Sequence, residues 1–379
     1  MAKKQRVVHM TTVHHPTDPR IYHKQCKSLA KAGFQVYYIA KDDESLEDIE
    51  NIQHIPVKQY GNRISRMIFG SISAYRKAKK LKADIYHFHD PELMIVGALL
   101  KNKHNTVIYD VHEDYVTSIL QKDYLPKFLR HIFAKVYTWM EKLFITKMEL
   151  SLAEKYYYNL YKRGELILNY PLLNENFLTK NRKKEKIEPK LLYTGNVTED
   201  RGALFHAEIP AIHNEVSVHF IGKCPKELSE KMYNQAKGHE ERIHIEGIDR
   251  FVEKEDIDRK YEEREWLAGI ALFPPTDHYM QKELTKFFEY MNAGLPIICS
   301  NFPVWQEFIE TYECGIAVDP YDHVAIKQAI TYLLEHPDKA KQMGEKGRQA
   351  VMNELNWQEE AKKLISWYDK ILKNRTVSH

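Results

Sequence analysis

The feature that most constrains the fold is an alternation of short apolar segments with amphipathic helical segments, which runs through the chain twice. Short apolar segments between helices are typical of strands in a parallel sheet that helices cover on both faces. In the first half the expected strands are residues 6–10, 34–40, 84–89, 106–112 and 165–171. In the second half they are residues 190–196, 216–222, 242–247, 269–275, 296–300 and 315–320, and helices are expected from about residue 322 to 372.

The two runs are separated by residues 174–190, a polar and charged stretch with the composition of a linker. A chain of 379 residues also exceeds the size at which a single core stops growing, roughly 250–300 residues. We therefore predict two doubly wound α/β domains in tandem. Because ligands of such domains bind beyond the carboxyl ends of the strands, the candidate site residues are those that follow strands.

The composition is that of a globular protein without a membrane span. Hydrophobic residues make up 43% and charged residues 29% of the chain, and no apolar run reaches the roughly 18 residues that cross a bilayer. The first expected strand begins at Arg6, which leaves no room for a signal peptide. The four cysteines lack the spacing of a metal site. We expect reduced thiols and a cytoplasmic location.

Charge is distributed unevenly between the two halves. Residues 1–172 carry 27 lysines and arginines against 18 aspartates and glutamates, whereas the rest of the chain is acidic. The predicted helix 63–82 contains no acid, and residues 123–147 interleave basic with aromatic side chains. Such a helix suits the inner face of an anionic membrane, or it packs on the core with a basic outer face. Both interpretations stay open, and no nucleic-acid partner is expected.

A helix that begins near Thr285 follows a strand and its loop, so its first N–H groups are aimed at the site edge of the sheet. Lys286 in its first turn opposes the helix dipole, for which an anionic ligand would give a reason. Glu289 lies one turn later on the same face, where a carboxylate can accept both hydroxyls of a ribose. The alternative is a solvated helix face with an ordinary Lys–Glu pair.

Another strand runs to Gly195, and Arg201 follows in the loop after it. Glycine lets the backbone approach a phosphate, and arginine can bind one through two hydrogen bonds. Neither a G-x-G-x-x-G nor a G-x-x-x-x-G-K-[ST] sequence occurs, so this signal is unspecific alone. Asp256-Ile257-Asp258 has the form of a D-x-D metal motif, but its charged helical surroundings favour a solvated face.

Histidines and carboxylates follow two strands of the first half, in the sequences HFHDPEL (87–93) and IYDVHED (108–114). A histidine in such a place can bind a substrate hydroxyl, which makes His89 and His112 candidates. His87 is more typical of a structural histidine. Nothing in the spacing requires three ligands that converge on a metal ion.

Together these segments resemble the bacterial family 4 glycosyltransferases, which are retaining enzymes with the GT-B fold of two Rossmann-like domains facing across a cleft. The resemblance runs nearly end to end, through DPRIYHKQCKSLAKAGFQV, HFHDPEL, YDVHED, LNYP, TGNVTEDRG, TKFFEYMNAGLPIICSNFPVWQEFI, CGIAVDP and the C-terminal helices. The FEYMNAGLP block is the most specific, and HFHDPEL points to the subset that builds cell-surface polysaccharides or glycolipids. The resemblance implies residues 1–172 as the acceptor-side domain, completed by helices in 357–379, then a linker at 173–190 and a nucleotide-sugar domain at 191–356.

The resemblance also assigns roles to single residues. Glu289 would hold the donor ribose, and Arg201, Lys286 and the helix start would face the diphosphate, with Arg201, Lys286 and His112 as the catalytic set. His112 would lie by the transferred sugar. The donor-binding set it implies is Gly195, Asn196, Arg201, Gln281, Thr285, Lys286 and Glu289, and the acceptor-side set is Arg20, His89, Asp90 and Glu113.

Three positions depart from the family pattern. Asn196 stands where an arginine is usual, and Gln281 where the first of two glutamates is usual. The first loop reads TTVHHPTDPR in place of a glycine pair, and Arg20 in it is expected to contact the acceptor or a phosphate. These departures leave the donor sugar open.

The function we expect is transfer of a sugar, with retention, from a nucleotide-diphosphate donor, a UDP-sugar by preference, to a glycan or lipid-linked acceptor, without a metal ion or other cofactor. The location is the cytoplasm, with the inner face of the cell membrane as a possible partner surface. Two alternatives stay open. One is a non-catalytic sugar-nucleotide-binding partner in a polysaccharide assembly machine, and the other is a GT-B epimerase.

Overall fold

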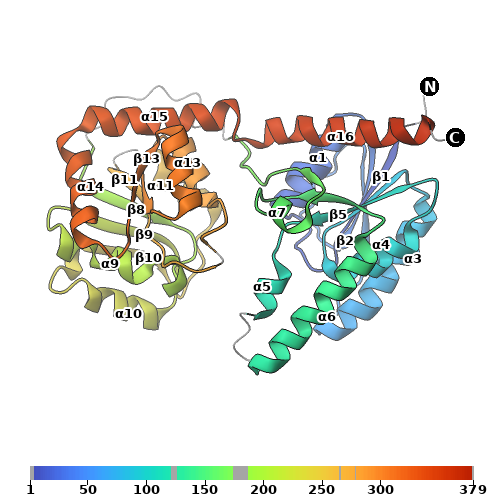
Figure 1. Ribbon diagram of the computed structural model, residues 1–379, viewed down its shortest axis with the longest axis horizontal. Helices are drawn as coiled ribbons and strands as arrows, with labels where there is room; N and C mark the ends of the chain where they lie inside the picture. The colour runs from blue at the N-terminus through green and yellow to red at the C-terminus, as the bar shows by residue number, and fades with distance from the viewer. Residues whose placement is uncertain (1–3, 121–125, 174–186, 264–265, 278, 378–379) are drawn as a thin grey trace. The chain divides into compact units, whose positions relative to one another are not determined.

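The computed structural model describes residues 4–120, 126–173, 187–263, 266–277 and 279–377. The chain forms two compact units, one of residues 1–169 with 357–379 and one of residues 170–356. Each is described by itself (Figure 1). Most of the linker predicted at 173–190 lies outside the described residues.

The first unit is built on a seven-stranded sheet, ordered β3-β2-β1-β4-β5-β6-β7, in which every pair of neighbours is parallel. Its strands are β1 (Arg6–Met10), β2 (Gln35–Lys41), β3 (Ile52–Val57), β4 (Ile85–Phe88), β5 (Thr106–Val111), β6 (Glu149–Leu152) and β7 (Glu165–Leu166). Its helical segments are η1 (Pro19–Cys26, a π-helix), α1 (Lys27–Lys31), α2 (Arg63–Ser65), η2 (Arg66–Gly70), α3 (Ser71–Leu81), η3 (Pro91–Leu93), α4 (Met94–Leu100), α5 (Tyr115–Leu120), α6 (Lys127–Ile145), α7 (Tyr157–Tyr161) and α16 (Trp357–Val377).

Alternate residues of these strands point into two separate cores. On one face Val8, Phe88 and Tyr109 pack with buried side chains of α3, α4 and α6. On the other face Val7, Ile85 and Ile108 pack with η1, α1 and the last helix, α16, which contributes Trp357, Leu364, Trp367 and Tyr368. Figure 1 shows α16 beside α1. The end of the chain therefore supplies part of the first unit's core.

The second unit has a six-stranded parallel sheet, ordered β10-β9-β8-β11-β12-β13. Its strands are β8 (Lys190–Thr194), β9 (Ser217–Cys224), β10 (Ile243–Ile248), β11 (Ala268–Ala271), β12 (Ile297–Ser300) and β13 (Gly315–Val318). Its helical segments are η4 (Glu199–Arg201), α9 (Ala203–Ile212), α10 (Lys226–Gln235), η5 (Glu240–Arg242), α11 (Lys254–Glu263), α12 (Thr285–Ala293), α13 (Pro303–Tyr312), α14 (His323–Glu335) and α15 (Pro337–Asn353).

The structure confirms the predicted pair of doubly wound domains and corrects two strands. Residues 165–171 contribute only the two-residue β7, and β3 was not expected. β3 is an edge strand that contains Pro56, and a proline weakens the sequence signal of a strand. In the part of the chain that the structure describes, no helix has the length and apolar character needed to cross a bilayer.

Candidate active site

The second unit collects positive charge at the carboxyl end of β8. The chain leaves this strand through Gly195, whose backbone is left-handed with φ +84°, and Arg201 follows at the end of η4. The Arg201 Nε donates a hydrogen bond of 3.2 Å to the Tyr279 hydroxyl, which in turn donates to Asp200 Oδ2 at 3.0 Å. The guanidinium is thus held in place by a neutral hydroxyl, and it forms no carboxylate ion pair among the described residues.

Lys286 joins this charge from the first turn of α12. Its side chain is only 8% exposed, and its ammonium lies 4.7 Å from the centre of the Tyr193 ring. Burial lowers the pKa of Lys286 to about 8, with Arg201 acting in the same direction and Glu289 opposing it. No carboxylate lies within ion-pair distance of it in the described part of the chain. The expected alternative of a solvated face therefore does not apply to Lys286.

The start of α12 adds its own free donors. Its N-cap residue, Leu284, offers no side-chain acceptor, and no acid occurs in the first turn. A Cβ built on Gly195 would lie 3.0 Å from the Lys286 ammonium, so a side chain at this position would crowd it. We call Arg201, Lys286 and the first turn of α12 the cationic cluster. Its chemistry suits a di-anionic group such as a diphosphate.

Glu289 lies one turn further along α12 and is half-buried. It accepts a hydrogen bond of 3.3 Å from the Tyr261 hydroxyl, which is also 2.7 Å from Thr194 Oγ1 at the end of β8. The carboxylate is thereby held beside the strand end rather than paired with Lys286. One of its oxygens remains for a ligand hydroxyl.

The remaining donor candidates lie at the surface. The side chains of Asn196, Gln281 and Thr285 are exposed, and the carbonyl of Asn196 accepts a hydrogen bond from Tyr193 at 2.8 Å. Their donor contacts stay predictions. The sequence reasoning missed the tyrosines that hold the site, Tyr193, Tyr261 and Tyr279. They come from a strand, a helix and a loop, and no motif links them.

The first unit gathers histidines on one face of its sheet. His9, His87 and Asp110 stand on β1, β4 and β5, on the face toward α16, and His89 and His112 extend it beyond the strand ends. Asp110 is fully buried and accepts hydrogen bonds from Arg20, from Ser151 and from His89 Nδ1. Burial alone would raise the pKa of Asp110, but the Arg20 charge and the histidine hydrogen bonds hold it well below its usual range.

The structure buries three of the four acceptor-side candidates in the first unit, and their acceptor contacts stay predictions. Arg20 is buried and donates to both oxygens of Asp110, at 2.8 and 2.7 Å, and to the Ile167 carbonyl. His89 is buried between Asp110 and His9. Asp90 is buried and accepts from the Thr12 and Val13 N–H groups. Asp90 thus holds the loop after β1, whereas Arg20 and His89 are bonded within the interior of the unit, and Glu113 is the exposed one of the set.

His87, His89 and Asp110 place potential metal-ligand atoms within 4.8 Å of one another. The set fits a metal poorly, because Asp110 already accepts bonds from Arg20, Ser151 and His89, and an ion there would lie against the Arg20 guanidinium. We assign no metal to it. That the reaction needs no metal ion stays a prediction.

His112 is half-buried, with Nδ1 3.1 Å from the Asp110 carbonyl and Nε2 3.0 Å from His14 Nε2. Burial lowers the pKa of His112, and the charges of His14 and Arg20 act in the same direction. A carbonyl can only accept, so the His112 nitrogen that donates to Asp110 is Nδ1, and the lowered pKa favours the neutral ring. His14 was not among the predicted site residues.

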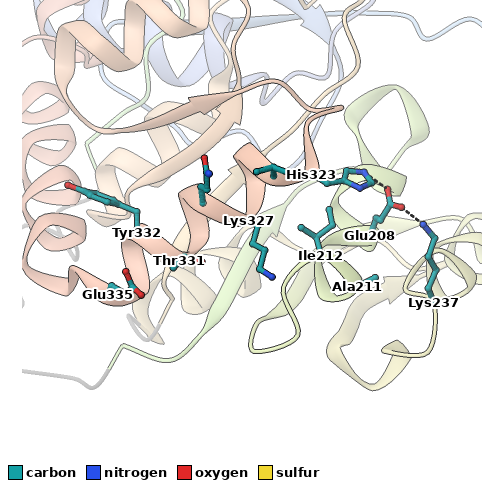
Figure 2. A pocket seen from close by; sticks show the side chains of 11 residues that line it. Glu208, Ala211, Ile212, Lys237, His323, Lys327, Thr331, Tyr332 and Glu335 are labelled. Atoms are coloured by element: carbon teal, nitrogen blue, oxygen red, sulfur yellow. Dashed lines mark hydrogen bonds and ion pairs between the residues drawn. The ribbon is translucent and has the colours of Figure 1, made fainter.

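A separate surface groove of about 720 Å³ lies between α9 and α14 of the second unit. Figure 2 shows Glu208 in it between His323, at 3.3 Å, and Lys237. None of the predicted site residues lines it, and its carboxylate is already paired. The groove therefore does not enlarge the candidate site.

Two parallel doubly wound units, one with a cationic cluster after its first strand, define a protein of the GT-B glycosyltransferase type. Residues 179–350 match the family model described as glycosyl transferases group 1, and residues 19–153 match the one described as glycosyltransferase family 4. The two matches together take in most of the chain. The chain belongs to the family 4 glycosyltransferases.

Relatives agree with this assignment. Spore coat protein SA of Bacillus subtilis (strain 168) is 26% identical over 189 residues, 48% of this chain and 48% of that protein, so the match spans about half of that relative. Sucrose-phosphate synthase from Thermosynechococcus elongatus superposes over 98% of this chain and 100% of its own, with a TM-score of 0.72 and 17% identity. Anabaena HepE in complex with UDP-glucose superposes over 96% and 99%, with a TM-score of 0.68 and 10% identity. At these identities the two solved structures establish the fold.

Proposed function

We propose that the protein transfers a sugar from a UDP-sugar, with retention of anomeric configuration, to a hydroxyl of a cell-surface glycan or lipid-linked acceptor. The observation that carries the proposal is the cationic cluster. Two cations that have no carboxylate partner among the described residues converge with an uncapped helix start at one strand end, which is costly for the free protein and favourable once a diphosphate binds. The UDP-glucose complex of a structural neighbour supports the choice of nucleotide.

In this proposal the protein acts mainly on the leaving group. Arg201, Lys286 and the first turn of α12 stabilise the negative charge that develops on the diphosphate, which is the role a metal ion takes elsewhere. Glu289, oriented by Tyr261, accepts the ribose hydroxyls. No protein nucleophile is invoked, so the acceptor attacks the face that the diphosphate leaves, and His112 contacts the transferred sugar.

A membrane-bound acceptor is supported by one side of α6. Phe128, Ile132, Val136, Trp139 and Leu143 follow one another at helical spacing and are each about half exposed or more. We call these five residues the apolar stripe. Lys135 and Lys142 border it, and an apolar groove of about 400 Å³ that includes Trp139 opens beside it, against α5.

Neighbouring helices extend this surface. α4 packs against both α3 and α6, as Figure 1 also shows, and it exposes Ile95 and Leu99. η2 and α3 expose Ile68, Phe69 and Ile72 among basic residues. Exposed apolar side chains bordered by lysine and arginine suit the surface of an anionic bilayer, where each basic residue contributes about 1 kcal/mol.

The first test is donor turnover. The purified protein is incubated with UDP-, GDP- and ADP-sugars, with and without a membrane-lipid extract, and the released nucleotide diphosphate is measured. Release from one donor, increased by lipid, supports the proposal. Nucleotide binding without release under any condition refutes transfer and favours the non-catalytic sugar-nucleotide partner, the alternative that neutral Asn196 and Gln281 support.

The membrane surface is tested separately by flotation with vesicles that contain anionic lipid. Trp139→Glu should reduce flotation strongly, because it places a carboxylate in the apolar stripe. The matched control is Leu160→Glu, which changes an exposed apolar residue of α7 outside the stripe. Equal flotation of both variants and the unmodified protein would exclude the stripe as the membrane contact.

A further inference from the structure

The loop after β1 brings a second histidine to His112. The side chain of His14 is 16% exposed, and its Nε2 lies 3.0 Å from Nε2 of His112. Its Nδ1 lies 3.5 Å from Asp18 Oδ2, and its Nε2 lies 3.4 Å from Asp90 Oδ1. His14 therefore has a carboxylate near each nitrogen and an imidazole at one of them.

The positions of the protons follow from the partners. The Asp110 carbonyl can only accept, so His112 carries its proton on Nδ1 and presents the lone pair of Nε2. The donor in the short Nε2–Nε2 contact must then be His14. The Asp18 carboxylate, 3.5 Å from the other His14 nitrogen, can only accept, so a favourable contact there requires a second proton. Only the imidazolium form of His14 satisfies both neighbours.

The electrostatic surroundings agree with this arrangement. Burial would lower the pKa of His14, but the hydrogen bond to Asp18 and the charges of Asp90, Asp18 and Glu113 raise it above the ordinary value. The groups facing the pair are thus Asp18 from its own loop, Asp90 after β4, and Glu113 after β5. Arg20 and Asp110 act on His112 from the interior.

We propose that His14 is a positioning residue for the transfer reaction: its imidazolium donates Nε2–H to Nε2 of His112, fixes the tautomer of His112, and holds that nitrogen ready for a sugar hydroxyl. When a sugar binds, a hydroxyl replaces His14 as the donor to His112 and accepts the freed His14 proton in a hydrogen bond. The role of His14 in transfer rests on the proposed function, because that function assigns the sugar contact to His112. The proton arrangement of the two histidines is independent of it.

The pair predicts a pH signature. Above the pKa of His14 a neutral ring keeps one proton. It then loses the bond either to His112 or to Asp18, so kcat/KM should fall as pH rises through that pKa. His14→Ala should lower kcat/KM about tenfold near neutral pH, the size of one charge-assisted hydrogen bond, and should lack that descending limb. Asp18→Asn keeps an oxygen for the start of η1 but removes one acceptor of His14, and should move the limb to lower pH.

The test combines this profile with nitrogen NMR of the histidine rings in the full chain. We expect His14 to be doubly protonated at neutral pH and His112 to be the Nδ1–H tautomer, and we expect the pKa of His112 to rise in His14→Ala. His15→Ala is the control, because that neighbouring ring is 70% exposed and lies outside the pair. A neutral His14 at pH 7, or His112 signals unchanged in His14→Ala, would overturn the proposal. Absence of turnover on any donor would overturn the proposed function and the role in transfer, while the NMR result still decides the pair.

Discussion

Replacing Lys286 with methionine should make the free protein more stable and its complex with UDP weaker. The lysine is 8% exposed, no carboxylate of the residues that the structure describes lies within ion-pair distance of it, and burial lowers its pKa from 10.5 to about 8. At about 1.36 kcal/mol per pKa unit, holding the charge in the folded protein costs about 3 kcal/mol below pH 8. The contact of the ammonium with the ring of Tyr193 offsets up to about 2 kcal/mol of this cost. Methionine fills a similar volume, so the expected net gain is about 1–3 kcal/mol.

The direction of the Lys286 pKa shift determines how the stability penalty changes with pH. The folded pKa is lowered, so between pH 8 and 10.5 the unfolded chain binds the proton that the folded protein releases. The penalty is complete below pH 8 and disappears as pH rises toward 10.5. The stability difference between Lys286→Met and the unmodified protein should therefore shrink over this interval.

The assay is urea unfolding followed by circular dichroism, with and without UDP, together with calorimetric UDP binding. Loss of one charged contact should weaken UDP binding about ten- to a hundredfold. Lys231→Met is the matched control, since that lysine is 61% exposed and pairs with Glu199 at the surface, and it should change neither quantity. A Lys286→Met protein that is less stable at pH 7, or that binds UDP as tightly as before, would refute the reasoning.

Three further changes test other parts of the two units. Arg201→Ala should lower kcat about a hundredfold or more, the loss typical of one preorganised contact to the leaving group, and near-native turnover would remove Arg201 from the mechanism. Glu289→Ala should raise the KM for the donor about tenfold and change kcat less, because the ribose contact is made both in the bound substrate and in the transition state. If steady-state kinetics give the variant the same donor KM as the unmodified protein, Glu289 does not bind the ribose. Asp110→Asn should destabilise the protein by about 3–5 kcal/mol at pH 7, because it leaves Arg20 as an uncompensated buried charge. The pKa of Asp110 is depressed in the folded protein, so its contribution to stability is complete above the usual carboxyl range and is lost as pH falls below it. The free energies of unfolding of the variant and the unmodified protein, measured with urea, should therefore converge in acid.

The sequence predicted the parts of the fold that rest on local pattern. Apolar strands alternate with helices over the whole chain, and Gly294, left-handed at φ +70°, ends α12 where the sequence turns toward β12. The strand that was missed, β3, is an edge strand with a proline. The expected strand 165–171 has only two residues in regular strand pairing, and after them two single backbone hydrogen bonds continue, from Ile167 to Leu152 and from Asn169 to Ala153. Both errors fall at the edges of the first sheet, where burial imposes the weakest pattern.

The candidate site was predictable only where one short segment carries it. Lys286 and Glu289 lie on one helix turn, so their spacing was informative. Arg20 and Asp110 are 90 residues apart in sequence, and only the fold shows that they form a buried ion pair. Polar residues at strand ends look alike in sequence whether they face a ligand or one another. The sequence therefore shows neither the burial of Arg20, His89 and Asp90 nor the contact of His14 with His112.

The packing of α16 has a consequence for biosynthesis. Trp357, Leu364, Trp367 and Tyr368 complete a core whose other members are made more than 180 residues earlier. During translation this face of the first unit's sheet is therefore covered only by η1 and α1 until α16 has been made. The second unit is one continuous segment and needs no later residue. The unit that is synthesised second is thus the first that can finish folding, and a chain that ends before Trp357 leaves part of the first unit's apolar core open to solvent.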